Sequence, residues 1–443
     1  MEHAADLSGI AFVIITALIC GMFMARLGQP PLVGYLLSGV ILGPTGFGLI
    51  KNEGIVAYFA ELGILLLLFI VGMELSVRTL KFTWRIALPA VLLQSAGSLL
   101  VVFLLAWIID LPLSTAVLLG FVIALSSTAV AVKMLDEVKA SRNRIGRITI
   151  AVLIAQDLAF LPMMLIVENM GGEGLGFGGA LKFVGAVVLL ALLIRFLLQQ
   201  GRAHLPFYRL FSKYPDLSPL AGLVYCFGGG ALLGLMGLSP AYGAFLAGLL
   251  VGNSAERRPM LLVVRPIQTV LLMVFFLSIG LLIDLGFIWR NIGVVLSLFL
   301  IVMVFKTGLN VAILRLLGET WQRAFLAGVL MSQMGEFSFL LAATGLTVGA
   351  ISSDESRLII AVTALSLGLS PFWLSTTRRL QLIATRGIDG WRDILLSTFV
   401  RERAILRWTL RRIARLRRFI FYCLTEIRKT CHKKLLNNRD NNA

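Results

Sequence analysis

Apolar runs long enough to cross a membrane recur along the chain, separated by short stretches of charged residues, glycine and proline. A membrane-spanning helix needs about 20 predominantly apolar residues. The pattern therefore predicts an all-α polytopic membrane protein with about thirteen transmembrane helices. We expect these helices at residues 8–25, 31–50, 55–75, 86–109, 112–135, 146–168, 177–200, 217–238, 240–254, 266–284, 291–317, 323–347 and 357–376.

Composition supports this class, because 58% of the residues are hydrophobic and only 14% are charged. Such a balance excludes a soluble globular domain. The N-terminal MEHAADLSG has no basic segment and no small-residue cleavage site. We therefore expect the first apolar run to be a retained helix rather than a signal peptide.

Basic residues are unevenly distributed, and most of the net charge of +17 lies after residue 376. Residues 377–443 predict a basic amphipathic helix on the cytoplasmic membrane surface, in contact with anionic lipids rather than nucleic acid. Arginine and lysine also favour one set of alternate loops along residues 1–376. By the positive-inside rule, the N-terminus lies outside and the C-terminus inside.

The chain also contains an internal repeat. PLVGYLLSGVILG (31–43) recurs as PAYGAFLAGLLVG (240–252), and two further segment pairs align at a nearly constant offset. These pairs are AVLLGFVIALSST (116–128) with AFLAGVLMSQMGE (324–336), and IAVLIAQDLAFLP (150–162) with IAVTALSLGLSPF (360–372). Repeat one then covers 8–168 and repeat two 217–376, with a linker helix at 177–200. A single linking helix makes the repeats inverted in topology, as in secondary transporters.

Two charged residues lie deep within apolar segments. Asp157 is central in ITIAVLIAQDLAFLPMMLIV (148–167), and Lys306 lies within NIGVVLSLFLIVMVFKTGLNVAIL (291–314). A charge at the membrane midplane costs about 2.5–3.5 kcal/mol on insertion scales and marks functional positions. Burial disfavours the charged form of the aspartate and a nearby ammonium favours it. The pair indicates a pathway for protons or cations.

Helices of inverted-repeat transporters break near the midplane and expose carbonyl groups to the ion. Two aligned segments favour such breaks over simple close packing of small residues. The first contains Ser126, Ser127 and Thr128, which we group with Gln156 and Asp157 as ion- and proton-binding residues. The second, the crossing helix of repeat two, contains Ser332, Gln333, Gly335 and Glu336.

The roles of the remaining charges have alternatives. Lys306 is expected to be the counter-charge of Asp157, in an ion pair that cation binding displaces. Alternatively, it is a static lysine bonded to carbonyl groups of broken helices. Glu336 either lines the ion path or neutralises the N-terminus of a half-helix.

The order and spacing of several motifs resemble the second family of monovalent cation:proton antiporters, especially the membrane domain of the glutathione-gated potassium efflux antiporters. The motifs are QPPLVGYLLSGVILGP, GMEL (72–75), SSTAVAVKML, AQDLAFLP, FFLSIGLLID and SQMGEFSFLL. The resemblance covers residues 8–376. It implies a homodimer in which a core of helices 4–6 and 11–13 moves like an elevator against a scaffold of helices 1–3 and 8–10.

The resemblance also implies residue roles. Asp157 matches the aspartate that binds ion and proton, Gln156 matches the glutamine of potassium-type members, and Lys306 matches the basic residue of the eleventh helix. Lys133 departs from the neutral residue expected at its position. After residue 376 there is no GxGxxG and no βαβ pattern, so we expect no nucleotide-binding regulatory domain.

We therefore predict a secondary active transporter that exchanges a monovalent cation, potassium by preference, for protons by alternating access. Sodium/proton exchange, or a gated cation channel or sensor on the same fold, are the alternatives. An enzyme is not expected, because the sequence has no HExxH and no paired membrane aspartates. We expect no cofactor, no metal beyond the transported cation, and a location in a bacterial inner membrane.

Overall fold

The computed structural model describes residues 2–27, 29–48, 53–75, 77–141, 143–170, 177–200, 205 and 217–386. The chain divides into two units, Met1–Leu374 and Ser375–Ala443, and all that follows concerns the first unit unless stated otherwise. The amphipathic helix expected in the basic tail lies outside the described residues.

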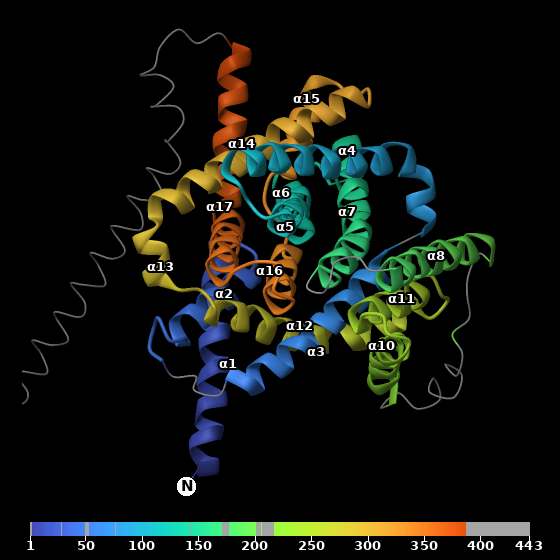
Figure 1. Ribbon diagram of the computed structural model, residues 1–443, viewed down its shortest axis with the longest axis vertical. Coiled ribbons are helices and arrows are strands. Elements are labelled where there is room, and N and C mark those ends of the chain that lie inside the picture. Colours follow the sequence, from blue (N-terminus) through green and yellow to red (C-terminus); the bar gives the residue numbers. More distant parts are fainter. Residues whose placement is uncertain are drawn as a thin grey trace, which may run out of the picture. The chain divides into compact units, whose positions relative to one another are not determined.

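The described residues form helices, and the expected all-α class is confirmed (Figure 1). From the N-terminus they are α1 (Glu2–Arg26), α2 (Pro31–Leu42), α3 (Glu53–Glu74), α4 (Val77–Ile109), α5 (Leu113–Ala124), α6 (Thr128–Glu137), α7 (Arg144–Glu168) and α8 (Phe177–Gln200). The second half contains α10 (Ser218–Leu235), α11 (Pro240–Gly252), α12 (Arg257–Leu281), α13 (Leu285–Arg290), α14 (Ile292–Leu316), α15 (Trp321–Leu330), α16 (Phe337–Thr347) and α17 (Ser353–Arg386).

Several helices extend beyond the predicted boundaries. The helix expected at 86–109 begins at Val77, the one expected at 266–284 begins at Arg257, and the one expected at 357–376 ends at Arg386. The prediction followed apolar residues, which mark the part of a helix inside the hydrocarbon. In all three cases the helical backbone continues past the apolar run.

Six of the described helices are long and apolar enough to cross a membrane by length and composition. Their apolar spans are Thr83–Ile109, Arg144–Glu168, Leu181–Gln199, Ser218–Leu235, Arg257–Leu281 and Ile292–Leu316. Shorter apolar helices include α5 and α16, which are halves of interrupted segments. The total of thirteen spans stays a prediction.

The helices pack in two groups, linked by α8 (Figure 1). In one group α2 packs on α1 and α12, and α11 packs on α3 and α10. In the other, α4 packs on α5, α7 and α14, while α16 contacts α5 and α7. The linker α8 touches α4 and α7 on one side and α11 on the other. This grouping agrees with the division into core and scaffold that the family resemblance implies.

Glycines of the repeated motif allow helices to pack backbone against backbone. A Cβ atom at Gly39 of α2 would overlap the carbonyl oxygen of Leu277 in α12. At the aligned position in repeat two, a Cβ atom at Gly248 of α11 would overlap the carbonyl oxygen of Phe69 in α3. The repeat therefore preserves small residues because both contacts need a close approach of the backbones.

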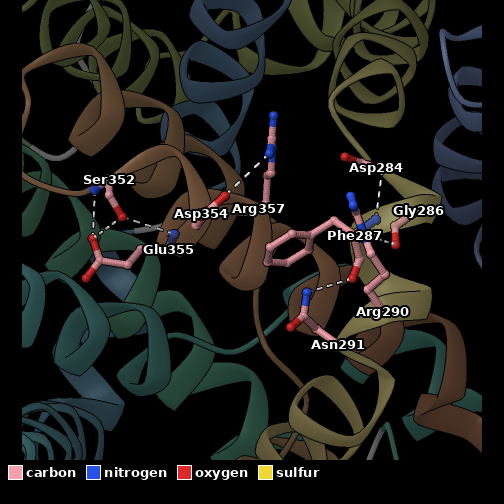
Figure 2. Close-up of polar contacts among 9 residues, drawn as sticks. All are labelled: Asp284, Gly286, Phe287, Arg290, Asn291, Ser352, Asp354, Glu355 and Arg357. Carbon is pink, nitrogen blue, oxygen red and sulfur yellow. Dashed lines mark hydrogen bonds and ion pairs between the residues drawn. The ribbon is translucent and has the colours of Figure 1, made fainter.

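Side-chain caps set the starts of two helices (Figure 2). Asp284 accepts a hydrogen bond from the backbone N–H of Phe287 (2.9 Å) and begins the short helix α13, which the apolar pattern did not predict. At α17, Glu355 accepts from the N–H and the hydroxyl of Ser352 (2.7 and 2.8 Å), while the Ser352 hydroxyl accepts from Glu355 N–H (3.3 Å). This reciprocal arrangement is a capping box.

Candidate functional site

Two interrupted helices meet at the centre of the second helix group. α5 ends at Ala124 and α6 begins at Thr128, while α15 ends at Leu330 and α16 begins at Phe337. The two extended interruptions touch through an antiparallel bridge between Ser126 and Met334. The expected pair of broken crossing helices is thus confirmed, with the breaks inside the two aligned segments.

The long helices α7 and α17 hold the two breaks in equivalent ways. The backbone N–H of Ser126 donates to Gln156 Oε1 of α7 (3.1 Å). In repeat two, the backbone N–H of Met334 donates to Ser366 Oγ of α17 (3.0 Å). These donors would be left unpaired where the helix stops, and a buried unpaired N–H costs about 1–3 kcal/mol. Each repeat supplies one polar side chain to satisfy its own break.

Asp157 lies beside the first break. Asp157 is 8% exposed, and its carboxylate accepts hydrogen bonds from Thr128 Oγ1, at 3.1 Å to Oδ2 and 3.3 Å to Oδ1. Thr128 is the first residue of α6, so the carboxylate faces the positive end of that helix. Glu336 follows Met334, whose backbone bridges that of Ser126, by two residues, so a second carboxyl group belongs to the crossing. An oxygen-rich, acidic site is therefore formed at the crossing.

The other two hydroxyls of the first break have partners other than Asp157. Ser126 Oγ donates to the carbonyl oxygen of Met331 (2.7 Å), which ties the two breaks together. Ser127 Oγ caps α6 by accepting from the N–H of Val130 (3.3 Å). Of the three predicted hydroxyls, only that of Thr128 is hydrogen-bonded to Asp157.

Lys306 occupies a different position from the one expected. Its side chain is 2% exposed, and Nζ donates to the carbonyl oxygens of Leu125 and Gln333, the second at 3.2 Å. Among the described residues, the ion pairs within 4.0 Å do not include one between Lys306 and Asp157. The expected direct ion pair is therefore wrong for this conformation. The observed geometry is the alternative, an ammonium bonded to carbonyl groups at the negative ends of α5 and α15.

The second break leaves buried oxygen atoms without hydrogen-bond donors. Ser332 Oγ and Gln333 Nε2 donate to carbonyls of the preceding turn, those of Val329 (2.8 Å) and Leu330 (2.6 Å). Within the described residues, Gln333 Oε1 and Glu336 Oε2 are buried with no hydrogen-bond partner. Glu336 immediately precedes α16, at the positive end of that half-helix. Gly335 lets the two breaks approach, because a Cβ there would lie 3.0 Å from the Ser126 carbonyl oxygen.

Two buried amides at this site were not predicted. Gln94 of α4 donates through Nε2 to Asn310 Oδ1 of α14 (2.8 Å), and Asn310 Nδ2 donates to the Met331 carbonyl (3.1 Å). Gln156 Nε2 donates to Gln94 Oε1 (2.8 Å). The sequence signal was available, since both amides lie within apolar helices, where such polar groups are rare.

The sequence comparison decides the family. A family model described as "Sodium/hydrogen exchanger, transmembrane" matches residues 14–379. The chain belongs to the sodium/hydrogen exchanger family. Members of this family are cation/proton antiporters, so the chain is an integral, multi-pass membrane transporter and not an enzyme.

Relatives of this exchanger are named for different ions. It is 46% identical over 410 residues to the iron transporter MagA of Paramagnetospirillum magneticum, covering 93% of this chain and 94% of that protein. It is 33% identical over 370 residues to the glutathione-regulated potassium-efflux system protein KefC of Cronobacter sakazakii. This match covers 80% of this chain and 58% of KefC. Identity to K(+) efflux antiporter 5 of Arabidopsis thaliana is 29% over 370 residues. This match covers 82% of this chain and 65% of that antiporter. The exchanger thus spans less than two thirds of both potassium antiporters.

A solved structure agrees with the fold. The sodium proton antiporter MjNhaP1 of Methanocaldococcus jannaschii superposes with a TM-score of 0.65, covering 86% of this exchanger and 99% of that chain. The identity of 16% limits this likeness to the fold. The inverted repeats with two crossing helices are accordingly the architecture of a cation/proton antiporter.

Proposed function

We propose that this exchanger transports potassium against protons by alternating access, with Asp157 binding the cation and the proton in turn. The observation that carries the proposal is the contact of a buried carboxylate with the first residue of a half-helix, at 3.1 and 3.3 Å. Carboxylate, hydroxyl and carbonyl oxygens suit a hard monovalent cation. One carboxylate cannot hold a proton and a cation together, and this competition couples the two fluxes.

The preference for potassium rests on Gln156 and on the named relatives. Gln156 places a neutral amide next to Asp157. In the family that the sequence resembles, potassium-type members have glutamine at this position. KefC and the Arabidopsis antiporter are both named for potassium. The alternative monovalent cation is sodium.

Iron is a second candidate because the relative named as an iron transporter shares 46% identity over almost its whole length. Asp157 and Glu336 could together neutralise a divalent cation. Among the described residues, however, no three His, Cys, Asp or Glu side chains form a metal-binding group. The geometry therefore favours a monovalent cation.

Proton flux in proteoliposomes tests these assignments. Purified exchanger is reconstituted into vesicles that contain a pH dye. Potassium, sodium and lithium are added in separate experiments, and Fe²⁺ is added under anaerobic conditions. The proposal expects the largest internal pH change with potassium. A response to sodium alone or to Fe²⁺ alone would transfer the assignment to that ion, and cation flux without proton movement would indicate a channel.

We further propose a homodimer in a bacterial inner membrane, with the N-terminus outside and the C-terminal basic tail on anionic cytoplasmic lipids. The loop asymmetry in arginine and lysine supports this orientation. Accessibility of single cysteines introduced at Lys51 and Lys139 to a membrane-impermeant thiol reagent tests it. Labelling of intact cells is expected at the first position only.

A further inference from the structure

Three buried amide side chains from three helices form a hydrogen-bonded chain behind the crossing. They are Gln94 of α4, Gln156 of α7 and Asn310 of α14, each at most 3% exposed. Gln156 donates to Gln94 (2.8 Å), and Gln94 donates to Asn310 (2.8 Å). Isolated amides are costly in a membrane protein unless they are satisfied, and satisfied networks hold helices in one arrangement.

Both ends of this chain bind the crossing, and together they close a ring. At one end Gln156 Oε1 accepts from Ser126 N–H (3.1 Å), and at the other Asn310 Nδ2 donates to the Met331 carbonyl (3.1 Å). Ser126 Oγ completes the circuit by donating to the same carbonyl (2.7 Å). We call these five residues, Ser126, Gln156, Gln94, Asn310 and Met331, the amide ring.

The amide ring permits one orientation of each amide group. If Gln94 turned over, its NH2 group would face the NH2 of Gln156 and its oxygen would face Asn310 Oδ1. If Gln156 turned over, its NH2 group would face the Ser126 N–H. Each reversal replaces hydrogen bonds by like-with-like contacts in a buried site, where unsatisfied groups cost most. The ring is therefore a rigid frame rather than an adaptable cluster.

This frame carries the ion-binding groups. Asp157 directly follows Gln156 in α7, and Thr128 lies two residues after Ser126. The Thr128–Asp157 contact is consequently anchored on both sides by ring members. Both ends of the Gln156 amide are hydrogen-bonded within the ring, because Oε1 accepts from Ser126 N–H and Nε2 donates to Gln94. The placement makes Gln156 a positioning residue, which differs from the ion-ligand role predicted from the sequence.

We propose that the amide ring fixes the spacing of the Asp157 site, and that Gln94 thereby determines which monovalent cation the exchanger prefers. The inference rests on the proposed cation/proton exchange and adds its basis of selectivity. Monovalent cations differ mainly in radius and dehydration cost, so discrimination requires ligands held within about 0.5 Å. Gln94 touches neither the ion nor Asp157, and it acts through Gln156.

The test compares apparent KM values for potassium, sodium and rubidium in proteoliposomes of wild type and Gln94→Met. Methionine keeps the length of the side chain and removes both ring hydrogen bonds. The expected result is a change in the sodium-to-potassium KM ratio toward one, by about five-fold, the equivalent of one neutral hydrogen bond. Proton coupling persists because Asp157 is retained.

The matched control is Gln268→Met, at a half-buried position of α12 outside the ring. Its KM ratios should equal those of wild type. Asn310→Leu breaks the ring at its other end and should shift the KM ratios in the same direction. This second variant tests the ring if Gln94→Met does not fold. A general structural defect would instead lower the maximal rate for every ion and leave the ratios unchanged.

Unchanged ratios in active Gln94→Met and Asn310→Leu proteins would overturn the role of the ring while leaving cation/proton exchange in place. Absence of exchange in wild type with all three ions would overturn the proposed monovalent exchange and this inference with it. The wild-type arm thus separates the two failures.

Discussion

Replacement of Lys306 by methionine distinguishes the observed carbonyl contacts from the predicted ion pair. The substitution removes the two hydrogen bonds to Leu125 and Gln333 while preserving most of the side-chain length. Each lost hydrogen bond to the charged ammonium group costs about 1.5–3 kcal/mol. Methionine avoids the desolvation of an ammonium group, which offsets part of that cost. We expect a net loss of about 2–3 kcal/mol in the free energy of unfolding.

The decisive comparison repeats the substitution in an Asp157→Asn background. If Lys306 acts on the carbonyl groups, its replacement lowers the thermal unfolding midpoint in detergent equally in both backgrounds. Independent sites add within about 0.5 kcal/mol. If Lys306 were paired with Asp157, breaking that buried pair would cost about 3–5 kcal/mol in wild type only. A loss that largely disappears in the Asp157→Asn background would therefore refute our reasoning. The exposed Lys182→Met substitution serves as the control and should change nothing.

Three further substitutions test separate contacts. Glu319→Gln weakens the ion pairs of a buried carboxylate with the exposed Arg144 (2.6 Å) and Arg323 (3.5 Å) and should lower the unfolding midpoint, because both guanidinium groups lose their charged partner; a midpoint equal to wild type would contradict this. Gly248→Ala should reduce the yield of monodisperse protein on size-exclusion chromatography, whereas Gly293→Ala, with open space around it, should not; equal yields would argue against the close backbone contact. Thr128→Val removes the hydroxyl next to Asp157 and should raise the apparent KM for the cation about five-fold, as measured by concentration-dependent proton flux; an unchanged KM would exclude that hydroxyl from the site.

The repeat pattern in the sequence was sufficient to predict the interrupted helices. Serine and glycine at aligned positions marked both breaks, and their placement follows from general rules of transporter architecture. The bond of Ser126 was not predictable, and the carbonyl contacts of Lys306 were only the alternative to an ion pair, because these backbone carbonyls become available only where a helix stops. The sequence lists the side chains, but it does not state which backbone carbonyls lack a partner within their helix.

The amide ring shows a different limit of the sequence analysis. Formal charge marks Asp157 and Lys306 but not Gln94 and Asn310, although neutral amides in apolar helices are also unusual. Their pairing joins residues far apart in the chain, and its geometry depends on how α4, α7 and α14 pack. The cap at Asp284 was a simpler omission, because its N-cap signal is local.

The central claim is that Asp157 binds both the cation and the proton. Its most direct test is simultaneous measurement of potassium and proton flux in proteoliposomes containing Asp157→Asn, with the exposed Asp136→Asn substitution as the matched control. We predict that Asp157→Asn folds, because asparagine keeps the size and can still accept from Thr128, and that both coupled fluxes disappear. Asp136→Asn should retain both. Wild-type coupled flux in a correctly folded Asp157→Asn exchanger would contradict the account.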